Sequence, residues 1–309
     1  MKKTVKSFAV LLVAVMLLVP ALRAFAAEED CAPFVDSRYY TVGDYSIHYR
    51  VWEAEEPLGR IFMIHGFALS TVCLEELARL LVEGGYTCVL ADLPDFGYSS
   101  RETSETERLP REDIMHSLMT SLDDGPWFVA GHSMGGYVAT AIAQKYPDSV
   151  SNLLLYGTCG NPGSPAASLA ERPLAVKMLG GFMGVMSRCT PLVRLFLLLA
   201  TLDIGFTAGY DIKKITDPFK IPGTGVGAVY SFTMLPVTDY EAVSKMPPIL
   251  FVNGDRDLVI TDSSRKQLRA SLPAGSVDAV ISGGGHLMIQ THARETADVT
   301  LDFLSCVNG

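Results

Sequence analysis

Short apolar runs and helix-like patterns alternate along this chain, and no other feature constrains its fold as strongly. The runs "RIFMIHG", "YTCVLADL", "PWFVAGH" and "VSNLLLYGT" have the length and apolar content of buried strands. A segment with the apolar spacing of a helix follows each of the first three runs. Strands that alternate with helices predict an α/β fold with a mostly parallel, doubly wound sheet that helices cover on both faces.

The alternation stops after Thr158 and resumes with "PPILFVNGDRD", so the chain divides into a core and an insertion. The intervening residues hold the Gly/Pro clusters "GNPGSPAAS" and "IPGTGVG" around two apolar helical stretches, "PLAVKMLGGFMGVM" and "PLVRLFLLLATLDIGF". We therefore predict a helical cap at residues 159–245, inserted into a core formed by residues 27–158 and 246–309.

The first 26 residues have the parts of a secretory signal peptide: a charged start, "MKKTVK", an apolar run and the small-residue pattern "AFA". We expect cleavage after Ala26 and a secreted or extracytoplasmic protein, of bacterial type to judge from the pattern. An uncleaved membrane anchor is the alternative. The apolar run from Phe8 to Leu22 is short for a membrane span and contains Pro20, which favours cleavage.

The chain is acidic, with a formal net charge of −9. Cleavage makes it more acidic, because the first 26 residues carry Lys2, Lys3, Lys6 and Arg23 and no acid. Such a charge argues against nucleic acid or an anionic membrane as the main partner. We expect a small-molecule ester as the partner, with no nucleic acid and no stable membrane span after cleavage, and the oligomeric state stays open.

The cysteines all lie in the part expected to be exported, where disulfides are chemically permitted. Their spacing lacks the density of a disulfide scaffold and the C-x-x-C pattern of a metal site. Cys88 lies in an apolar run and is interpreted as a small buried hydrophobic residue. The pairing is left open, with Cys31–Cys306 and Cys159–Cys189 as candidates among Cys31, Cys73, Cys88, Cys159, Cys189 and Cys306.

The stretch "AGHSMGG" places Ser133 between Gly131 and Gly135, where a predicted strand meets a predicted helix. A nucleophile on so sharp a turn needs neighbours without side chains, so that strand and helix can approach each other. The helix N-terminus would also direct free N–H groups at an oxyanion. The alternative, an ordinary helix N-cap, explains the serine but not the two glycines.

A serine hydroxyl becomes a strong nucleophile only beside a base, which a carboxylate orients. Among the six histidines, His286 follows a predicted strand on a glycine-rich loop, at the sheet edge where active sites of parallel sheets form. The run "ILFVNGDRDLV" offers Asp255 and Asp257 after the preceding strand. Spacing alone does not separate these two aspartates, and each is also compatible with a turn or a helix cap.

The order Ser133, aspartate, His286, together with "IHGF" and "AGHSMGG", resembles the α/β-hydrolase fold family over nearly the whole chain after the signal segment. The resemblance implies that the acid is Asp257, the last residue of a G-x-x-D stretch. It also implies an oxyanion hole formed by two backbone N–H groups. The residues concerned are Phe67 and Met134, in a loop that His65 and Gly66 shape.

One position departs from the family's pattern. "DLPDFGYSS" resembles the family's D-x-P-G-x-G-x-S loop, but Asp95 stands where a glycine is usual. Aspartate tolerates a left-handed backbone better than most residues, so the turn is expected to survive.

The resemblance implies a serine hydrolase that cleaves carboxylic esters, small and lipophilic or of acylglycerol type, through an acyl-enzyme and without metal or cofactor. A peptidase, thioesterase, lactonase, carbon–carbon hydrolase or haloperoxidase would use the same triad, and a non-catalytic binding protein on a hydrolase scaffold is a further alternative. The cap's apolar side chains either line an acyl pocket under an adaptable lid or bury the cap on the core. They are Met178, Phe182, Met183, Met186, Leu195, Phe196, Leu197, Leu198 and Leu199.

Overall fold

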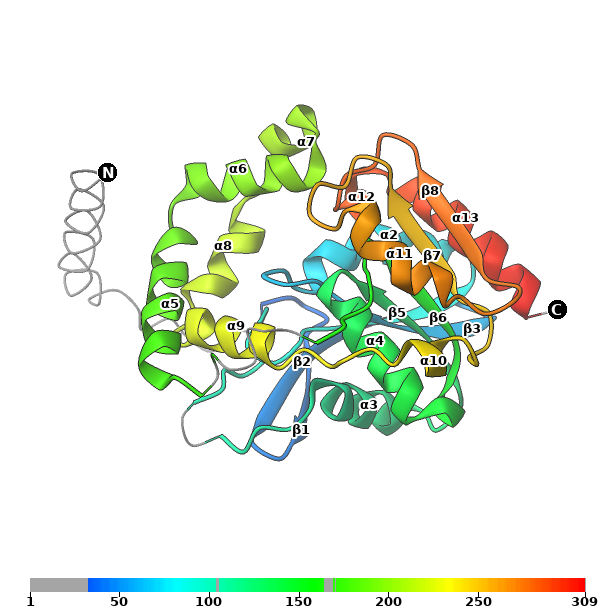
Figure 1. The fold of residues 1–309 in the computed structure, drawn as a ribbon, viewed down its shortest axis with the longest axis horizontal. Helices are drawn as coiled ribbons and strands as arrows, with labels where there is room; N and C mark the ends of the chain where they lie inside the picture. The colour runs from blue at the N-terminus through cyan, green and yellow to red at the C-terminus, as the bar shows by residue number, and fades with distance from the viewer. Residues whose placement is uncertain (1–32, 104–105, 164–168, 170, 309) are drawn as a thin grey trace. The chain divides into compact units, whose positions relative to one another are not determined.

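The strands of the described chain form one eight-stranded sheet, in the order β1-β2-β4-β3-β5-β6-β7-β8 (Figure 1). The computed structural model describes residues 33–103, 106–163, 169 and 171–308, and all these elements belong to the unit that begins at Asp36. The expected signal segment, residues 1–26, lies outside the described residues. The strands are β1 (Arg38–Val42), β2 (Tyr45–Trp52), β3 (Gly59–Ile64), β4 (Tyr86–Ala91), β5 (Trp127–His132), β6 (Val150–Tyr156), β7 (Leu250–Gly254) and β8 (Val277–Ile281).

The direction of the strands divides the sheet into two parts. From β4 through β3, β5, β6 and β7 to β8, every neighbouring pair is parallel. At the other edge, β1 and β2 pair antiparallel with each other, and β2 pairs antiparallel with β4. The predicted α/β fold with a mostly parallel sheet is confirmed.

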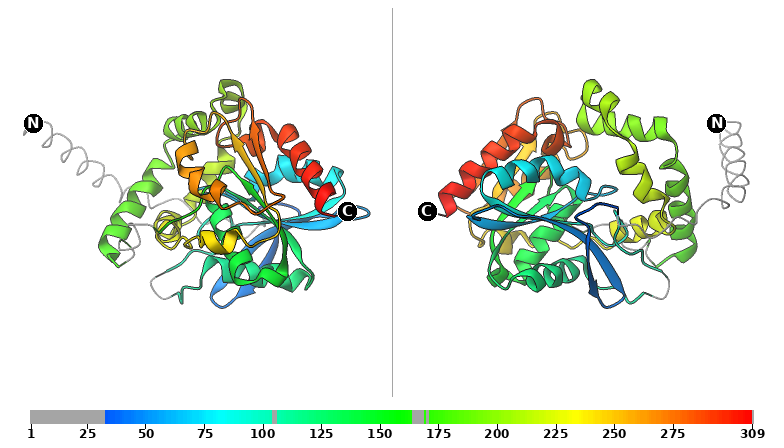
Figure 2. Two further views of the ribbon diagram at one scale, coloured as in Figure 1. Left: turned by 45° about the vertical axis from the view of Figure 1, so that its right-hand side comes forward. Right: turned by 180° about the vertical axis from the view of Figure 1, so that it is seen from behind.

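Helices cover both faces of this sheet. Successive residues of a strand point to opposite faces, and in the central strands both sets are apolar and buried. Phe62 and Ile64 of β3 pack in one core with α3 and α4, whereas Ile61 and Met63 pack in a second core with α2 and α13. Figure 2 shows α2 in cyan and α13 in red side by side on the second face. The helices outside the β6–β7 connection are the 3-10 turns η2 (Thr71–Leu74) and η3 (Pro147–Ser149), and α2 (Glu75–Glu83), α3 (Arg111–Leu122), α4 (Met134–Lys145), α11 (Asp262–Ala270), α12 (Met288–Thr291) and α13 (Ala293–Val307).

The β6–β7 connection, residues 157–249, carries the remaining helices, and Figure 1 shows α5 to α9 together beyond one end of the strands. Across the described ranges, no single helix is long and apolar enough to cross a membrane. The pair α5 and α6, bent by 92°, meets that criterion together by length and composition alone. The helices are α5 (Pro173–Met186), α6 (Thr190–Thr201), α7 (Ile204–Gly209), α8 (Lys213–Lys220), α9 (Thr224–Thr233) and α10 (Tyr240–Val243).

The structure corrects the predicted helices of this connection in two places. The second apolar stretch is not continuous: α6 ends at Thr201, Leu202 adopts a left-handed φ of 53°, and α7 follows. In addition, α9 forms over the glycine cluster of "IPGTGVG", where no helix was expected. A Cβ on Gly225 would lie 2.1 Å from the carbonyl oxygen of Gly180 in α5. Close packing between the two helices therefore selects a helix that local propensity disfavours.

The cysteines of the described chain are free, which contradicts the candidate pair Cys159–Cys189. Cys159 is buried and its Sγ lies 3.2 Å from the hydroxyl of Tyr137, whereas Cys189 is exposed between α5 and α6. Cys88 is fully buried, as its apolar neighbours predict. The other candidate pair includes Cys31, which lies outside the described residues.

Candidate active site

Ser133 sits on the turn between β5 and α4 with φ 52° and ψ −118°, a backbone conformation that side chains other than glycine rarely adopt. Its side chain makes no capping hydrogen bond to α4, so the N-cap interpretation does not describe it. A Cβ on Gly131 would lie 2.4 Å from the carbonyl oxygen of Gly135, and a Cβ on Gly135 would lie 2.3 Å from that of Ile64. Both glycines are thus required for strand and helix to meet at this turn.

The structure brings His286 and Asp257 to Ser133 from two other loops of the sheet edge. The Oγ of Ser133 lies 2.9 Å from Nε2 of His286, and Nδ1 of His286 lies 2.9 Å from Oδ2 of Asp257. His286 and Asp257 are 7% and 8% exposed, so the chain of contacts is shielded from water except near the serine. Asp255, left open by the sequence, instead accepts a hydrogen bond from the amide of Gly283 at 2.8 Å.

Asp257 is held as a carboxylate by several donors. Burial alone would raise its pKa, but the hydrogen bond and charge of His286 and the amides of Ile260 and Val259 outweigh burial and lower the pKa. An ionised carboxylate only accepts hydrogen bonds, so Nδ1 of His286 carries the proton and Nε2 is free to accept from the hydroxyl of Ser133. The contacts thus run from the hydroxyl of Ser133 through the ring of His286 to the carboxylate of Asp257.

Arg265, on α11, is a site residue that the sequence did not reveal. Its Nη2 donates to Oδ2 of Asp257, the same oxygen that faces His286, and its side chain is 4% exposed. Burial lowers the pKa of Arg265, and the charge of Asp257 opposes that effect. A separation of eight residues between an aspartate and an arginine does not predict this contact. It depends on the position of α11 relative to the loop that carries Asp257.

The loop that follows β3 lies directly against the turn at Ser133. A Cβ on Gly66 would lie 2.9 Å from Nδ1 of His132 and 3.0 Å from the Cβ of Ser133, so a side chain here would require these neighbours to shift. Phe67 follows in the loop, and Met134 is the first residue of α4, where backbone N–H groups have no partner within the helix. The loop and the helix N-terminus thus flank Ser133, and the role of Phe67 and Met134 as oxyanion donors stays a prediction.

His65 shapes this loop with its ring. Its Nε2 accepts a hydrogen bond from the amide of Leu93 at 3.0 Å, so Nδ1 carries the proton and donates to the carbonyl oxygen of Gly66 at 2.7 Å. The ring is fully buried, and burial lowers its pKa against the opposing charge of Asp92. His65 therefore acts through its shape and as a neutral group.

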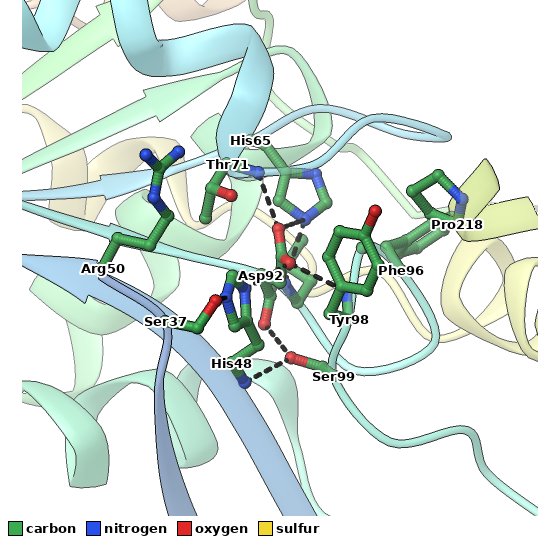
Figure 3. Close-up of polar contacts among 12 residues, drawn as sticks. Ser37, His48, Arg50, His65, Thr71, Asp92, Phe96, Tyr98, Ser99 and Pro218 are labelled. Carbon is green, nitrogen blue, oxygen red and sulfur yellow. Dashed lines mark hydrogen bonds and ion pairs between the residues drawn. The ribbon is translucent and has the colours of Figure 1, made fainter. Parts of the chain in front are cut away.

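Asp92 holds the segment that follows the His65 loop through hydrogen bonds of its carboxylate, as Figure 3 shows. Its Oδ1 accepts from the amide of Thr71 at 2.6 Å, and its Oδ2 accepts from the amide of Tyr98 at 2.9 Å and lies 2.8 Å from Nδ1 of His48. Burial would raise the pKa of Asp92, but His48 and its other partners lower it. One buried carboxylate thus fixes the segment after the His65 loop, the loop after β4, and strand β2.

Asp95 keeps the predicted left-handed turn, with φ 73°, and is fully buried. Its carboxylate binds Arg111 of α3 at 2.9 Å and accepts from the amide of Glu102 at 2.8 Å and the hydroxyl of Ser231 at 3.2 Å. A Cβ on Gly227 of α9 would lie 2.1 Å from Oδ1 of Asp95. The residue that departs from the family's glycine therefore ties the loop after β4 to α3 and to α9.

A cavity of about 700 Å³ opens at Ser133 and extends under α5, α6 and α8. Its volume lies in the usual range for small-molecule sites. Among the described residues that line it, no side chain is an acid, a lysine or an arginine, and the polar ones are Ser133, His286 and Ser187. The other lining residues are Gly66, Phe67, Ala68, Leu69, Phe182, Met183, Met186, Leu192, Val193, Phe196, Leu197, Ala200, Ile215, Phe219, Val259 and Leu287.

Only part of the predicted apolar lining faces this cavity. Phe182, Met183, Met186, Phe196 and Leu197 line it. Met178, Leu195 and Leu199 are instead 51%, 50% and 44% exposed, and Leu198 is not among the lining residues. A helix has several faces, so apolar content alone does not tell which side chains turn inward. Within the described residues, no group of three or more His, Cys, Asp or Glu side chains is arranged to hold a metal ion.

Comparison with known proteins finds similar sequences and similar solved structures. A sequence model described as the alpha/beta hydrolase fold matches residues 59–202. The chain is 27% identical over 243 residues to abhydrolase domain-containing protein abhd-5.2 of Caenorhabditis elegans, an alignment that covers 69% of this chain and 53%, about half, of that relative. It is 25% identical over 251 residues to the pimeloyl-acyl-carrier-protein methyl ester esterase of Xylella fastidiosa strain M12, covering 79% of this chain and 94% of the esterase.

A solved structure shows the same fold. The thermophilic esterase from Thermogutta terrifontis, with malate bound, superposes with a TM-score of 0.70 at 19% identity, covering 88% of this chain and 99% of the esterase. The chain therefore has the α/β-hydrolase fold, and its relatives indicate a hydrolase of the esterase/lipase-like type.

Proposed function

We propose that this protein is an extracytoplasmic serine esterase that hydrolyses carboxylic esters with an apolar acyl group. The observation that carries the proposal is the contact chain from Ser133 through His286 to Asp257 at the floor of an apolar cavity of about 700 Å³. The intact contact chain speaks against a binding protein without catalytic activity. The sequence of the first 26 residues supports export.

In the proposed reaction, Ser133 Oγ attacks the ester carbonyl carbon while Nε2 of His286 takes the hydroxyl proton. The backbone N–H groups of Phe67 and Met134 stabilise the negative charge that develops on the carbonyl oxygen. As the carbon–oxygen ester bond breaks, His286 gives the proton to the leaving alcohol. Water, deprotonated by His286, then attacks the acyl-enzyme, and the carboxylic acid leaves as Ser133 regains its proton.

The acyl group, in this proposal, occupies the cavity beneath α5 and α6, and the β6–β7 connection acts as a cap over the site. Leu287, next to the catalytic histidine, donates its amide to the carbonyl oxygen of Ala200 at the end of α6 at 3.3 Å. This contact supports a direct link between the cap and the histidine loop. A lining without charged groups favours aliphatic acyl chains over charged acyl groups.

A series of p-nitrophenyl esters from acetate to dodecanoate tests the proposal. We expect kcat/KM to rise with chain length while the cavity has room, by at most about fourfold per methylene, since burying one CH₂ contributes about 0.8 kcal/mol. Parallel assays with a thioester, a lactone and an aminoacyl amide of similar size separate the other acyl-transfer reactions. Absence of ester hydrolysis by folded protein would overturn the assignment.

A matched pair of variants locates the acyl site. Met186 lines the cavity, whereas Met178 of the same helix is 51% exposed. Met186→Trp should lower kcat/KM for dodecanoate at least about tenfold and leave acetate nearly unchanged, because the indole fills space that only a long chain needs. Met178→Trp should leave both values unchanged. An equal effect of the two substitutions would contradict the placement of the acyl group.

A further inference from the structure

Helices α5 and α6 expose apolar side chains that helices of a folded protein usually bury. Within α5 only Val176 and Gly180 are buried, and within α6 only Leu197 and Thr201. The exposed large apolar side chains of α5 and α6 form the apolar face. They are Leu174, Met178, Leu179, Phe182, Leu195, Phe196 and Leu199, which are 42% to 72% exposed. Exposed apolar surface of this extent marks a site that contacts another apolar phase or partner.

The apolar face adjoins the mouth of the cavity. Phe182 and Phe196 are 49% and 61% exposed, and both also line the cavity that ends at Ser133. An apolar molecule leaving a partner at this face would therefore meet an uncharged path to the serine.

The charges within α5, α6 and the residues that join them are positive, in contrast to the net charge of the whole chain. From Arg172 to Leu202 the sequence contains Arg172, Lys177, Arg188 and Arg194 and no aspartate or glutamate, although the formal net charge of the chain is −9. Lys177 and Arg188 are exposed. The net charge argued against an anionic membrane as the main partner, but it averages over a surface on which this region has the opposite sign.

We propose that the apolar face of α5 and α6 docks on the surface of an anionic lipid layer. Its aliphatic and aromatic side chains enter the boundary between head groups and acyl chains, and Lys177 and Arg188 lie at the level of the lipid phosphates. The cavity mouth at Phe182 and Phe196 then opens onto the acyl chains. Docking itself does not depend on the reaction proposed above, and the experiment uses a Ser133→Ala background in which lipid is not consumed.

The exposed cysteines allow a direct test of orientation. Cys189 lies between α5 and α6, and Cys306 lies on α13. An environment-sensitive dye is attached to Cys189 in one protein, with Cys31→Ser and Cys306→Ser, and to Cys306 in a matched protein, with Cys31→Ser and Cys189→Ser. With vesicles of phosphatidylglycerol and phosphatidylcholine, the dye at Cys189 should shift to the blue and be quenched by nitroxide-labelled lipid, whereas the dye at Cys306 should show neither effect.

Substitutions of residues that do not line the cavity test the chemistry of docking. Leu174→Gln, Leu179→Gln and Leu195→Gln together should weaken vesicle binding about tenfold or more, because less apolar surface enters the lipid boundary. Lys177→Gln or Arg188→Gln should each weaken binding about fivefold on anionic vesicles and reduce its salt dependence. The same substitutions should leave hydrolysis of a soluble butyrate ester unchanged when Ser133 is present.

A matched control carries Leu58→Gln and Val280→Gln, which alter side chains that are 68% and 58% exposed outside the β6–β7 connection. It should bind vesicles like the parent protein. Residues 8–22 are common to every variant, so differences among variants belong to the substituted surface. Equal quenching at Cys189 and Cys306, equal binding of all variants, or self-association through the apolar face without contact between Cys189 and lipid would each overturn the proposal.

Discussion

Ser133 combines a strained backbone with close support from its neighbours. Holding a residue other than glycine at a positive φ costs on the order of 1–3 kcal/mol of conformational free energy, which the surrounding contacts must offset. The amide of Ser133 donates to the carbonyl oxygen of Tyr156 at 2.9 Å, and the hydroxyl of Thr158 donates to the carbonyl oxygen of Ser133 at 2.7 Å. Strand β6 and the residues after it therefore hold the serine in the orientation that exposes Oγ to the cavity.

Arg265 provides a prediction at the scale of single residues. Its guanidinium shares an oxygen of Asp257 with His286, so in the proposed reaction it would compete with the imidazolium for that oxygen. Arg265→Gln removes this positive charge, and Asp257 should then hold the imidazolium more strongly. We expect the acidic limb of the kcat/KM profile to move to higher pH by roughly 0.5 to 1 pH unit, and Arg265→Lys to restore it in part.

The control for this prediction is Arg269→Gln, one turn further along α11, where the arginine pairs with Asp262 and Asp278. That substitution should leave the pH profile unchanged. If Arg265→Gln lowers the stability of the protein but leaves the acidic limb at the same pH, the arginine has a structural role only.

At the scale of elements, the buried ion cluster of Asp95, Glu102 and Arg111 joins parts of the chain that lie far apart in sequence. Arg111 of α3 binds Asp95 at 2.9 Å and Glu102 at 2.6 Å, and Ser231 of α9 donates to Asp95. The cluster ties the β6–β7 connection to the core through charged groups with almost no exposure to water.

Removing Arg111 from the buried cluster takes away the cation that Asp95 and Glu102 share, and leaves two buried carboxylates poorly compensated. Arg111→Met should lower the free energy of unfolding by about 3 kcal/mol, measured by urea denaturation. The comparison is Asp217→Ala, which breaks an ion pair with Lys220 in which both side chains are more than 40% exposed, and which should cost less than about 1 kcal/mol. Similar losses for the two variants would show that the cluster adds nothing beyond an exposed pair.

At the scale of the whole molecule, two neutral histidines at the centre of the fold make stability depend on pH. His65 and His132 are both fully buried. Burial, and to a smaller extent the neighbouring His286, lowers the pKa of His132 to about 3. Between pH 6.5 and about 3 the unfolded chain therefore binds a proton at His132 that the native protein does not, so stability decreases as the pH falls through this window.

This linkage predicts the effect of His132→Gln on acid unfolding. Between pH 6 and pH 4, the slope of the free energy of unfolding against pH should be smaller in His132→Gln than in the parent protein. The difference between the two slopes should be about 1.4 kcal/mol per pH unit. Urea unfolding at several pH values measures the slope. An unchanged slope in His132→Gln would show that His132 is not the group responsible.

The sequence predicts most of the core because its strands and helices differ in apolar spacing, and because "AGHSMGG" satisfies a steric requirement that few other stretches meet. The contacts of Asp257, Arg265 and Asp95 could not be predicted from spacing, since they depend on how loops from distant strands meet. Helix α9 was missed because its glycines have low helix propensity and are required for packing on α5. The local apolar pattern thus predicts most helices and strands, whereas tertiary packing determines which side chains contact one another.

The central claim is that Ser133 is the nucleophile of a serine hydrolase, and labelling with a fluorophosphonate probe, followed by intact-mass and peptide mass spectrometry, tests it most directly. We predict one label per chain, on Ser133, with labelling slowed at least about 10³-fold by His286→Gln. Ser37 is an internal comparison, because its hydroxyl also lies 2.9 Å from a histidine Nε2, that of His48. Folded protein that stays unlabelled, or a label on Ser37 in place of Ser133, would contradict the account.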